Sequence, residues 1–242
     1  MTKSHLLVDL DGTLLGLDID RFLPVYLQQL ATFVGEAVRL PDFSTRLMTA
    51  VATMVSSRGD RTTNEEAFYA TFRAGLTSET SDACDRAFMT FYRDIFPTLR
   101  QHTRPVPGAR SFVAAARRLG LHLILATSPV FPRFVIEERL GWAKIAPSDF
   151  DGITSFETCR HNKPDPLFYE EILRHFEIAP EAALMIGNDL RDDGAATQAG
   201  IDFAFVDGHY ARRKNRAGNP VWSGSMLALA RAIEGGDAPF VG

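Results

Sequence analysis

Long apolar runs and cysteines are both scarce in this sequence. No apolar stretch approaches the roughly 20 residues that a membrane-spanning helix needs, and no signal-type segment precedes the first apolar run. The two cysteines, Cys84 and Cys159, lack the spacing of a metal site, so we expect free thiols in a reducing compartment. These absences predict a soluble, cytoplasmic protein with no membrane partner.

The sequence also lacks an excess of positive charge and a glycine-rich phosphate loop. Its 26 Lys and Arg residues against 30 Asp and Glu give a net charge of −4, so no basic surface is expected for nucleic acid. No glycine-rich loop follows the first strand-like run, which argues against a dinucleotide-binding protein. Apolar residues make up 45% of the chain, enough for a sizeable core in one large domain or a core plus a smaller domain.

The pattern of apolar residues changes twice along the chain. Residues 5–10 form a short apolar run that stops at Asp11-Gly12, which is typical of a buried strand ending in a turn. Between residues 16 and 103 the apolar and aromatic residues recur at helical spacing in four stripes. Thr63 and Glu66 have the spacing of a capping box, which predicts a helix start. We therefore expect a helical bundle after the first strand.

From residue 105 onward, apolar strand-like runs alternate with helical segments. Strands are expected at 121–126, 152–154, 183–186 and 203–206, and helices at 109–118, 132–140, from 166, and at 193–199. This alternation predicts an α/β protein with a parallel sheet covered on both faces. Ligands of such sheets bind at the edge where the strands end. The predicted division is a core of residues 1–15 and 104–242 and an inserted helical domain of residues 16–103.

The segment Asp9-Leu10-Asp11-Gly12-Thr13 carries the strongest chemical signal. Two carboxylates alternate at a strand end, and the glycine permits a tight turn. Carboxylates this close repel, so keeping both ionised favours a bound cation or a lysine partner. The pattern Asp-x-Asp-Gly-Thr is expected by chance only on the order of 10⁻³ to 10⁻² times in such a chain. A turn whose aspartates merely cap backbone amides is therefore the weaker interpretation.

This motif resembles the first motif of the haloacid dehalogenase superfamily, and the three other family motifs follow in order. The resemblance implies a Rossmann-like core with a type-1 helical cap formed by residues 16–103, as in phosphoglycolate-phosphatase-like members. It implies that Asp9 is the nucleophile and that Asp11 gives and takes a proton. It also implies that Asp9, with the backbone near Asp11, binds Mg²⁺.

The second and third motifs supply a hydroxyl and a lysine. Thr127 ends the second apolar run, and the resemblance implies that it binds the phosphoryl group. Many members have Asn at the next position, where this chain has Ser128, so the role of that neighbour stays open. Lys163 precedes an Asp-Pro helix start, and the resemblance implies that it holds the nucleophile and the phosphoryl charge.

The fourth motif is an acidic loop after an apolar strand, as a hard cation requires. Asn188 directly follows Gly187, so the alignment with the family's Gly-Asp is ambiguous by one position. Asp189 is the first choice of Mg²⁺ ligand because its oxygen is charged, and Asn188 is the alternative. Asp192 or Asp193 is the later acid of the motif, which supports either the metal's waters or Lys163.

The motifs together predict a Mg²⁺-dependent phosphatase that hydrolyses a small phosphate monoester through an aspartyl phosphate. The dehalogenase branch of the superfamily generally lacks the second aspartate, which argues against dehalogenation here. A phosphonatase needs a cap lysine, and residues 16–103 contain none. A phosphomutase of the same superfamily remains an alternative, and so does a non-catalytic regulator that binds a phosphorylated ligand.

The identity of the small phosphorylated metabolite is left open, as is the choice between monomer and homodimer. Residues 209–220 form a polar, basic segment that we expect to be a solvated loop, with contact to an anionic substrate or partner as the alternative. Five arginines of the expected cap could bind a second anionic group, although each is better interpreted as a solvated helix residue: Arg21, Arg46, Arg58, Arg61 and Arg73.

Overall fold

A six-stranded parallel sheet forms the centre of the computed structural model, which describes residues 3–56 and 62–235. The strand order is β5-β4-β1-β6-β7-β8. The strands are β1 (His5–Val8), β4 (His122–Leu125), β5 (Gly152–Ile153), β6 (Ala183–Gly187), β7 (Asp202–Val206) and β8 (Trp222–Gly224). Because β1 lies between β4 and β6 and all three run in the same direction, their carboxyl ends meet at one edge.

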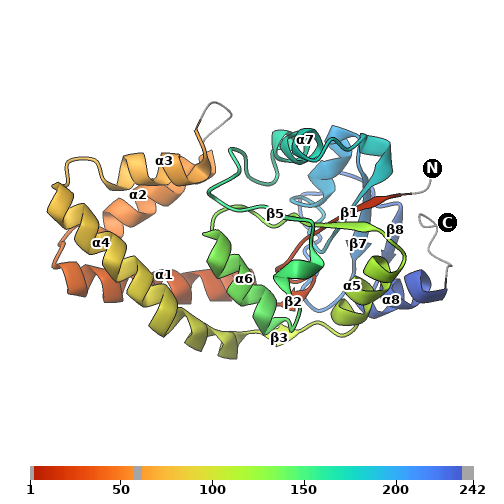
Figure 1. Cartoon of the computed structure of the whole chain (residues 1–242), viewed down its shortest axis with the longest axis horizontal. Helices are drawn as coiled ribbons and strands as arrows, with labels where there is room; N and C mark the ends of the chain where they lie inside the picture. Colours follow the sequence, from red (N-terminus) through yellow and green to blue (C-terminus); the bar gives the residue numbers. More distant parts are fainter. Residues whose placement is uncertain (1–2, 57–61, 236–242) are drawn as a thin grey trace.

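Helices cover both faces of this sheet (Figure 1). One face carries α5 (Ala109–Arg118), α6 (Arg133–Trp142) and α8 (Met226–Gly235), and the other carries α7 (Pro166–His175) and the 3-10 helix η5 (Gly194–Ala199). Alternate side chains of β1 serve the two faces, since Leu6 packs in the same cluster as Phe112, whereas Leu7 packs with Phe168. Short 3-10 turns, η3 (Pro147–Asp149) and η4 (Pro180–Ala182), precede β5 and β6.

A helical insertion separates the first strand from the rest of the sheet, and Figure 1 shows it beside the sheet. It consists of α1 (Ile19–Val38), α2 (Phe43–Ser56), α3 (Asn64–Phe72), α4 (Ser78–Thr90), the π-helical turn η1 (Phe91–Ile95) and the 3-10 helix η2 (Phe96–His102). Two short antiparallel strands, β2 (Leu15–Gly16) and β3 (Arg104–Pro105), close its base. Its interior is aromatic, with the ring of Phe72 packed against those of Phe43 and Phe88.

The start of α3 is fixed to the sheet region by hydrogen bonds. The backbone N–H of Asn64 donates to the Cys159 carbonyl at 2.8 Å, and its fully buried side chain donates to the Pro129 carbonyl at 3.0 Å. The Asn64 amide also donates to Asn162, whose own amide donates to the Met54 carbonyl in α2. Buried polar groups of this kind are costly when unpaired. The insertion is therefore held to the segment directly before Lys163.

The predicted α/β fold with a parallel sheet and helical covering is confirmed. The capping box is present as well, since Thr63 Oγ1 accepts from the Glu66 N–H while the Glu66 carboxylate accepts from the Thr63 N–H. The sequence pattern missed the short strands β2, β3 and β8 and the helix α8, and the helix expected at 193–199 is a 3-10 helix. Cys84 and Cys159 are both buried free thiols, as expected.

The described helices are those of a core and not of a bilayer span. Within residues 3–56 and 62–235, none combines the length and the apolar character of a membrane span. The longest, α1, has a polar outer face and buries Phe22, Tyr26, Leu30 and Val34 on the other. That spacing is typical of an amphipathic helix on a core.

The packing of α8 on the sheet gives a matched test of the fold. Leu229 is fully buried, whereas Leu227 on the same helix is 38% exposed. We expect Leu229→Ala to lower the free energy of unfolding by about 2–5 kcal/mol because it leaves a cavity. Leu227→Ala should have a much smaller effect. Urea denaturation of both variants measures the difference, and equal losses would contradict the packing of this face.

Candidate active site

Three neighbouring strands deliver side chains to one pocket at the carboxyl edge of the sheet. Asp9 directly follows β1, Asn188 directly follows β6, and Thr127 lies two residues beyond β4. All three residues line a cavity of about 320 Å³. The adjacency of β4, β1 and β6 therefore brings together motifs that are far apart in the sequence.

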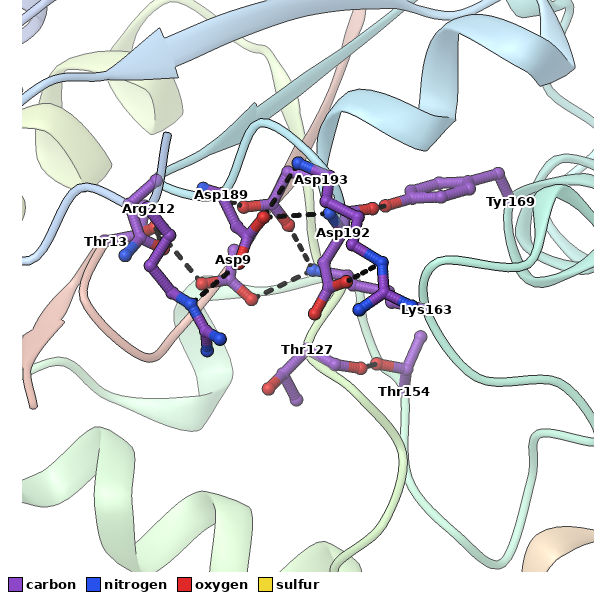
Figure 2. A network of polar contacts seen from close by, with 12 residues as sticks. Asp9, Thr13, Thr127, Thr154, Lys163, Tyr169, Asp189, Asp192, Asp193 and Arg212 are labelled. Atoms are coloured by element: carbon purple, nitrogen blue, oxygen red, sulfur yellow. Dashed lines mark hydrogen bonds and ion pairs between the residues drawn. The ribbon is translucent and has the colours of Figure 1, made fainter. Parts of the chain in front are cut away.

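Lys163 joins two buried carboxylates of this pocket, Asp9 and Asp193 (Figure 2). Its ammonium donates to Asp9 Oδ1 at 2.9 Å and to Asp193 Oδ1 at 2.6 Å. The Lys163 and Asp193 side chains are each only 2% exposed. The other oxygen of Asp193 accepts the backbone N–H of Asp189 at 3.0 Å. One lysine therefore links the strand β1 to the loop after β6.

Burial sets the protonation behaviour of this trio. Burial raises the pKa of Asp9 and of Asp193 above their ordinary values, and the charge of Lys163 only partly offsets it. Burial alone would lower the pKa of Lys163, but the charges of Asp193 and Asp9 outweigh it and raise that pKa well above its ordinary value. Lys163 thus stays charged, and its one positive charge serves two carboxylates.

Asp11 lines the same pocket and pairs with Arg139, a fully buried arginine of α6. Its Oδ1 contacts the Arg139 guanidinium, whose carbon lies 4.8 Å from the centre of the Phe131 ring. Arg139 makes no hydrogen bond within the described chain, so this carboxylate and this aromatic face are its compensation for burial. The side chain of Asp11 remains 17% exposed, so it can reach a bound molecule.

Thr13 orients the side chains that flank the turn after β1. Its hydroxyl lies 3.1 Å from both Asp9 Oδ2 and Asn188 Oδ1, and these two acceptors share its single proton. The Asn188 amide in turn donates to the Tyr210 carbonyl at 2.6 Å. Gly12 has a positive φ of 86°, and a Cβ there would lie 2.2 Å from the Asn188 amide nitrogen. Only glycine satisfies both the turn and this close approach.

Asp189 is held by its own loop and by an arginine of the basic segment. Its Oδ1 accepts the backbone N–H groups of Arg191 and Asp192, and its Oδ2 lies 3.0 Å from Arg212 Nε. Arg212 also approaches Asp20 of α1 at 3.6 Å. The segment expected to be a solvated loop therefore contributes a cation that bridges the site and the helical insertion.

The predicted site residues gather in this one pocket. Its lining includes Asp9, Asp11, Thr127, Ser128, Lys163, Asn188, Asp189, Asp192 and Asp193. Thr127 is fixed through its backbone carbonyl, which accepts the hydroxyl of Thr154 at 2.7 Å. Of the two later acids in the fourth motif, Asp193 is the one that contacts Lys163. Asp192 is half-buried, and burial together with the charge of Asp189 raises its pKa.

Sequence reasoning missed three contributors: Thr13, Arg139 and Arg212. Thr13 belongs to the first motif and was available from it. Arg139 and Arg212 could not be identified from the sequence, because a single arginine in a helix or in a basic loop gives no local indication of a buried partner. Conversely, Arg21, Arg46 and Arg73 do not line this pocket, and Arg58 and Arg61 lie outside the described residues.

The residues of this pocket fit a hard divalent cation. Among the described residues that line it, seven aspartates face two cations, Lys163 and Arg212. No three His, Cys, Asp or Glu side chains converge as a closed metal site within the ranges 3–56 and 62–235. Mg²⁺ does not need such a cage, because one or two carboxylates with waters and phosphate oxygens complete its shell. The surplus of carboxylates is the observation that favours it.

The chain matches a known protein family over most of its length. The family model described as haloacid dehalogenase-like hydrolase matches residues 4–200. Two curated relatives, CbbY of Cereibacter sphaeroides at 30% identity and phosphoglycolate phosphatase of Nitrosospira multiformis at 32%, match 46% and 50% of this chain. The match spans about half of their own length, 49% and 52%.

A likeness in structure extends over almost the entire chain. The crystal structure of CbbY from Rhodobacter sphaeroides in complex with phosphate has a TM-score of 0.57 and 20% sequence identity. The alignment covers 94% of this chain and 96% of that chain. At this identity the likeness concerns the fold, including the helical insertion, and not the ligand.

The buried trio predicts a pH-dependent stability effect. Lys163→Met would leave Asp9 and Asp193 without their cation, and we expect a loss of about 3–5 kcal/mol near neutral pH. A carboxylate whose pKa is raised on folding binds its proton more tightly in the folded state, so stability rises as the pH falls through that value. The deficit should therefore narrow between about pH 8 and about pH 5.5.

Urea titrations of the wild type, Lys163→Met and the exposed control Lys214→Met at both pH values measure this effect. In the wild type, the pKa of Lys163 is higher in the folded than in the unfolded state. Its charge therefore stabilises the fold fully at pH values below the unfolded pKa, and this stabilisation is lost only as the pH rises through the folded pKa. The contribution of the Lys163 charge is therefore constant over the tested range. The pKa values of Asp9 and Asp193 are raised in the wild type too, but loss of the lysine charge raises them further, so the variant gains more stability than the wild type as the pH falls. A deficit of equal size at both pH values would contradict the ion trio.

Proposed function

The chain belongs to the haloacid dehalogenase-like hydrolases, and from this premise we propose that it is a Mg²⁺-dependent phosphatase acting on a small phosphate monoester. The observation that carries the proposal is the pair Asp9 and Asp11 in one pocket with the buried Lys163 on Asp9. The names of the relatives support the same reaction class, since phosphoglycolate phosphatase is among them.

Asp9 is the proposed nucleophile. Each of its oxygens accepts one hydrogen bond, from Lys163 and from Thr13, which fixes the carboxylate and leaves lone pairs for attack. As the bond from Asp9 to phosphorus forms, the bond to the leaving alkoxide breaks, which gives an aspartyl phosphate. Covalent catalysis of this kind divides one difficult transfer into two easier steps.

Asp11 is the proposed general acid and base. Its Oδ1 contacts Arg139, which leaves Oδ2 to meet the leaving group. It would give its proton to the leaving alkoxide and then take a proton from the water that attacks the aspartyl phosphate. That second step breaks the bond from phosphorus to Asp9, releases phosphate and restores both carboxyl groups.

Charge on the phosphoryl oxygens is held by Lys163, with Thr127 as a hydrogen-bond donor. Mg²⁺ would be bound by Asp9, a backbone carbonyl near Asp11, and Asp189, with Asn188 as the alternative and Asp192 in support. When bound, it supplies positive charge that neutralises the phosphoryl oxygens. Asp193 is assigned to Lys163, which it contacts directly.

The helical insertion is proposed to act as a cap domain of residues 16–103 on a core of residues 1–15 and 104–242. Leu17, Ile19 and Leu23 line the same pocket as Asp9 and Asp11, which supports a role in covering bound substrate. The presence of Asp11 disfavours a dehalogenase. A phosphomutase would use the same residues, so the product distinguishes it.

The nucleophile assignment gives the first functional prediction. The wild type should release phosphate from a panel of phosphorylated metabolites and an aryl phosphate, and Asp9→Asn should lose turnover because an amide cannot attack phosphorus. Phosphate release and circular dichroism measure activity and fold, with Asp207→Asn, a partly exposed residue paired with Arg213, as the control. Full activity of Asp9→Asn would contradict the assignment. Isomerised sugar phosphate without net phosphate release would indicate a mutase.

The metal assignment is tested without turnover. Mg²⁺ that binds only the folded protein should stabilise it by about 2.7 kcal/mol at a concentration of 100 times Kd. The rise in Tm on adding Mg²⁺ should nearly vanish in Asp189→Ala and persist in part in Asn188→Ala. The reverse order would move the metal ligand to Asn188. No Mg²⁺-dependent rise in the wild type would contradict the metal site.

A further inference from the structure

A second cavity, of about 240 Å³, lies between the helical insertion and the loop that follows β4. Helices α1 and α2 form one wall, with side chains such as Leu30, Leu47 and Val51, and Phe131 and Phe156 of the sheet region form the other. Among the described residues that line it, none carries a charge, and tyrosines contribute the only polar side-chain atoms. It is therefore suited to an apolar group.

This cavity adjoins the pocket that holds Asp9. Leu23, Val130 and Phe131 line both spaces. These shared walls place the apolar space directly beside a phosphate that lies against Asp9 and Lys163. This adjacency favours the remainder of the substrate as the occupant over a separate ligand.

The charges of the insertion support the same conclusion. Arg46 is directed to the carbonyls of Phe72 and Ala74, and Arg73 pairs with Asp85. Arg21 pairs with Asp18 and is largely exposed. In the described part of the insertion, no arginine lines either cavity. A carboxylate or a second phosphate placed in the apolar cavity would therefore meet no cation among the described residues that line it.

We propose that the substrate is the phosphate monoester of an alcohol with an uncharged, apolar body, alkyl or aromatic, which occupies this cavity. The inference rests on the proposed phosphatase function and specifies its substrate class. The space is adequate, because an apolar cavity of roughly 150 Å³ is enough to bind benzene. The apolar body gains affinity by leaving water, while the phosphate is recognised by charge.

A homologous series of n-alkyl phosphates tests the proposal. Their leaving alcohols have similar acidity, so differences in kcat/KM between ethyl and octyl phosphate reflect binding of the alkyl chain and not intrinsic reactivity. We expect kcat/KM to rise about fourfold per methylene buried and then to level off when the chain exceeds the cavity. Calorimetric binding of the same series to Asp9→Asn should show the same trend without turnover.

A cavity-filling variant locates the effect. Val51→Phe places a ring in the cavity, and it should lower the hexyl-to-ethyl ratio of kcat/KM at least about tenfold, since it displaces two or more methylenes. Met48→Phe is the matched control, because Met48 lies on the same helix, is 49% exposed and does not line the cavity. Thermal unfolding of both variants checks that the fold is kept.

The outcomes separate the two proposals. If neither kcat/KM for phosphate release nor the affinity for Asp9→Asn changes with alkyl chain length, the apolar-substrate inference is overturned and the phosphatase proposal stands. Chain-length-dependent binding with no phosphate release from any compound would overturn the phosphatase and leave the apolar site. A chain-length preference unchanged by Val51→Phe would overturn the assignment to this cavity.

Discussion

The ion trio of Lys163, Asp9 and Asp193 is the interaction on which the active-site edge depends. It joins the end of the first strand, the segment before α7 and the loop after β6, three parts of the chain that no local structure connects. All three groups are buried, so the removal of one would leave an uncompensated charge in a medium of low dielectric. The chemistry proposed for Asp9 therefore relies on the same contact that holds the edge of the sheet together. Asn162, directly before Lys163, extends this dependence to the helical insertion, because it is hydrogen-bonded to Asn64 of α3 and to the Met54 carbonyl of α2.

Glycine is required at two positions, 12 and 187, because polar side chains of the site approach the backbone closely there. A Cβ at Gly187 would lie 2.1 Å from Asp193 Oδ2, so the carboxylate that meets Lys163 can reach its place only beside a glycine. A Cβ at Gly12 would likewise collide with the Asn188 side chain, and the positive φ of the turn at Gly12 also favours glycine. The turn could be foreseen from the Asp-Gly pair. The space that the Asn188 side chain needs beside Gly12 could not be foreseen, because it depends on the pairing of β1 with β6.

Much of the fold could be predicted because the longer core strands form apolar runs and the helices of the insertion show an apolar period. The runs ending at Asp9, Thr127 and Asn188 identify the three central strands, and the parallel arrangement then brings those residues to one edge. The short strands β2, β3 and β8 were missed because two or three residues show no period, and their pairing depends on tertiary contacts. Arg139 and Arg212 were missed for a related reason, since their partners come from distant segments. The apolar cavity could not be predicted either. Aromatic residues recur at the same helical spacing in the sequence whether they line a cavity or pack in a filled core.

Arg139 connects the charged and the apolar parts of the molecule. Its guanidinium is fully buried, and its compensation is the Asp11 carboxylate together with the face of the Phe131 ring. Phe131 is also a wall of both cavities. An apolar body in the second cavity would contact the ring on which Arg139 rests, and Arg139 in turn holds one oxygen of Asp11. Phe131 is itself only 4% exposed and packs on the ring of Tyr26, so this chain of contacts is in place without a substrate. The wall that would recognise the apolar body and the support of the proposed general acid are therefore the same side chain.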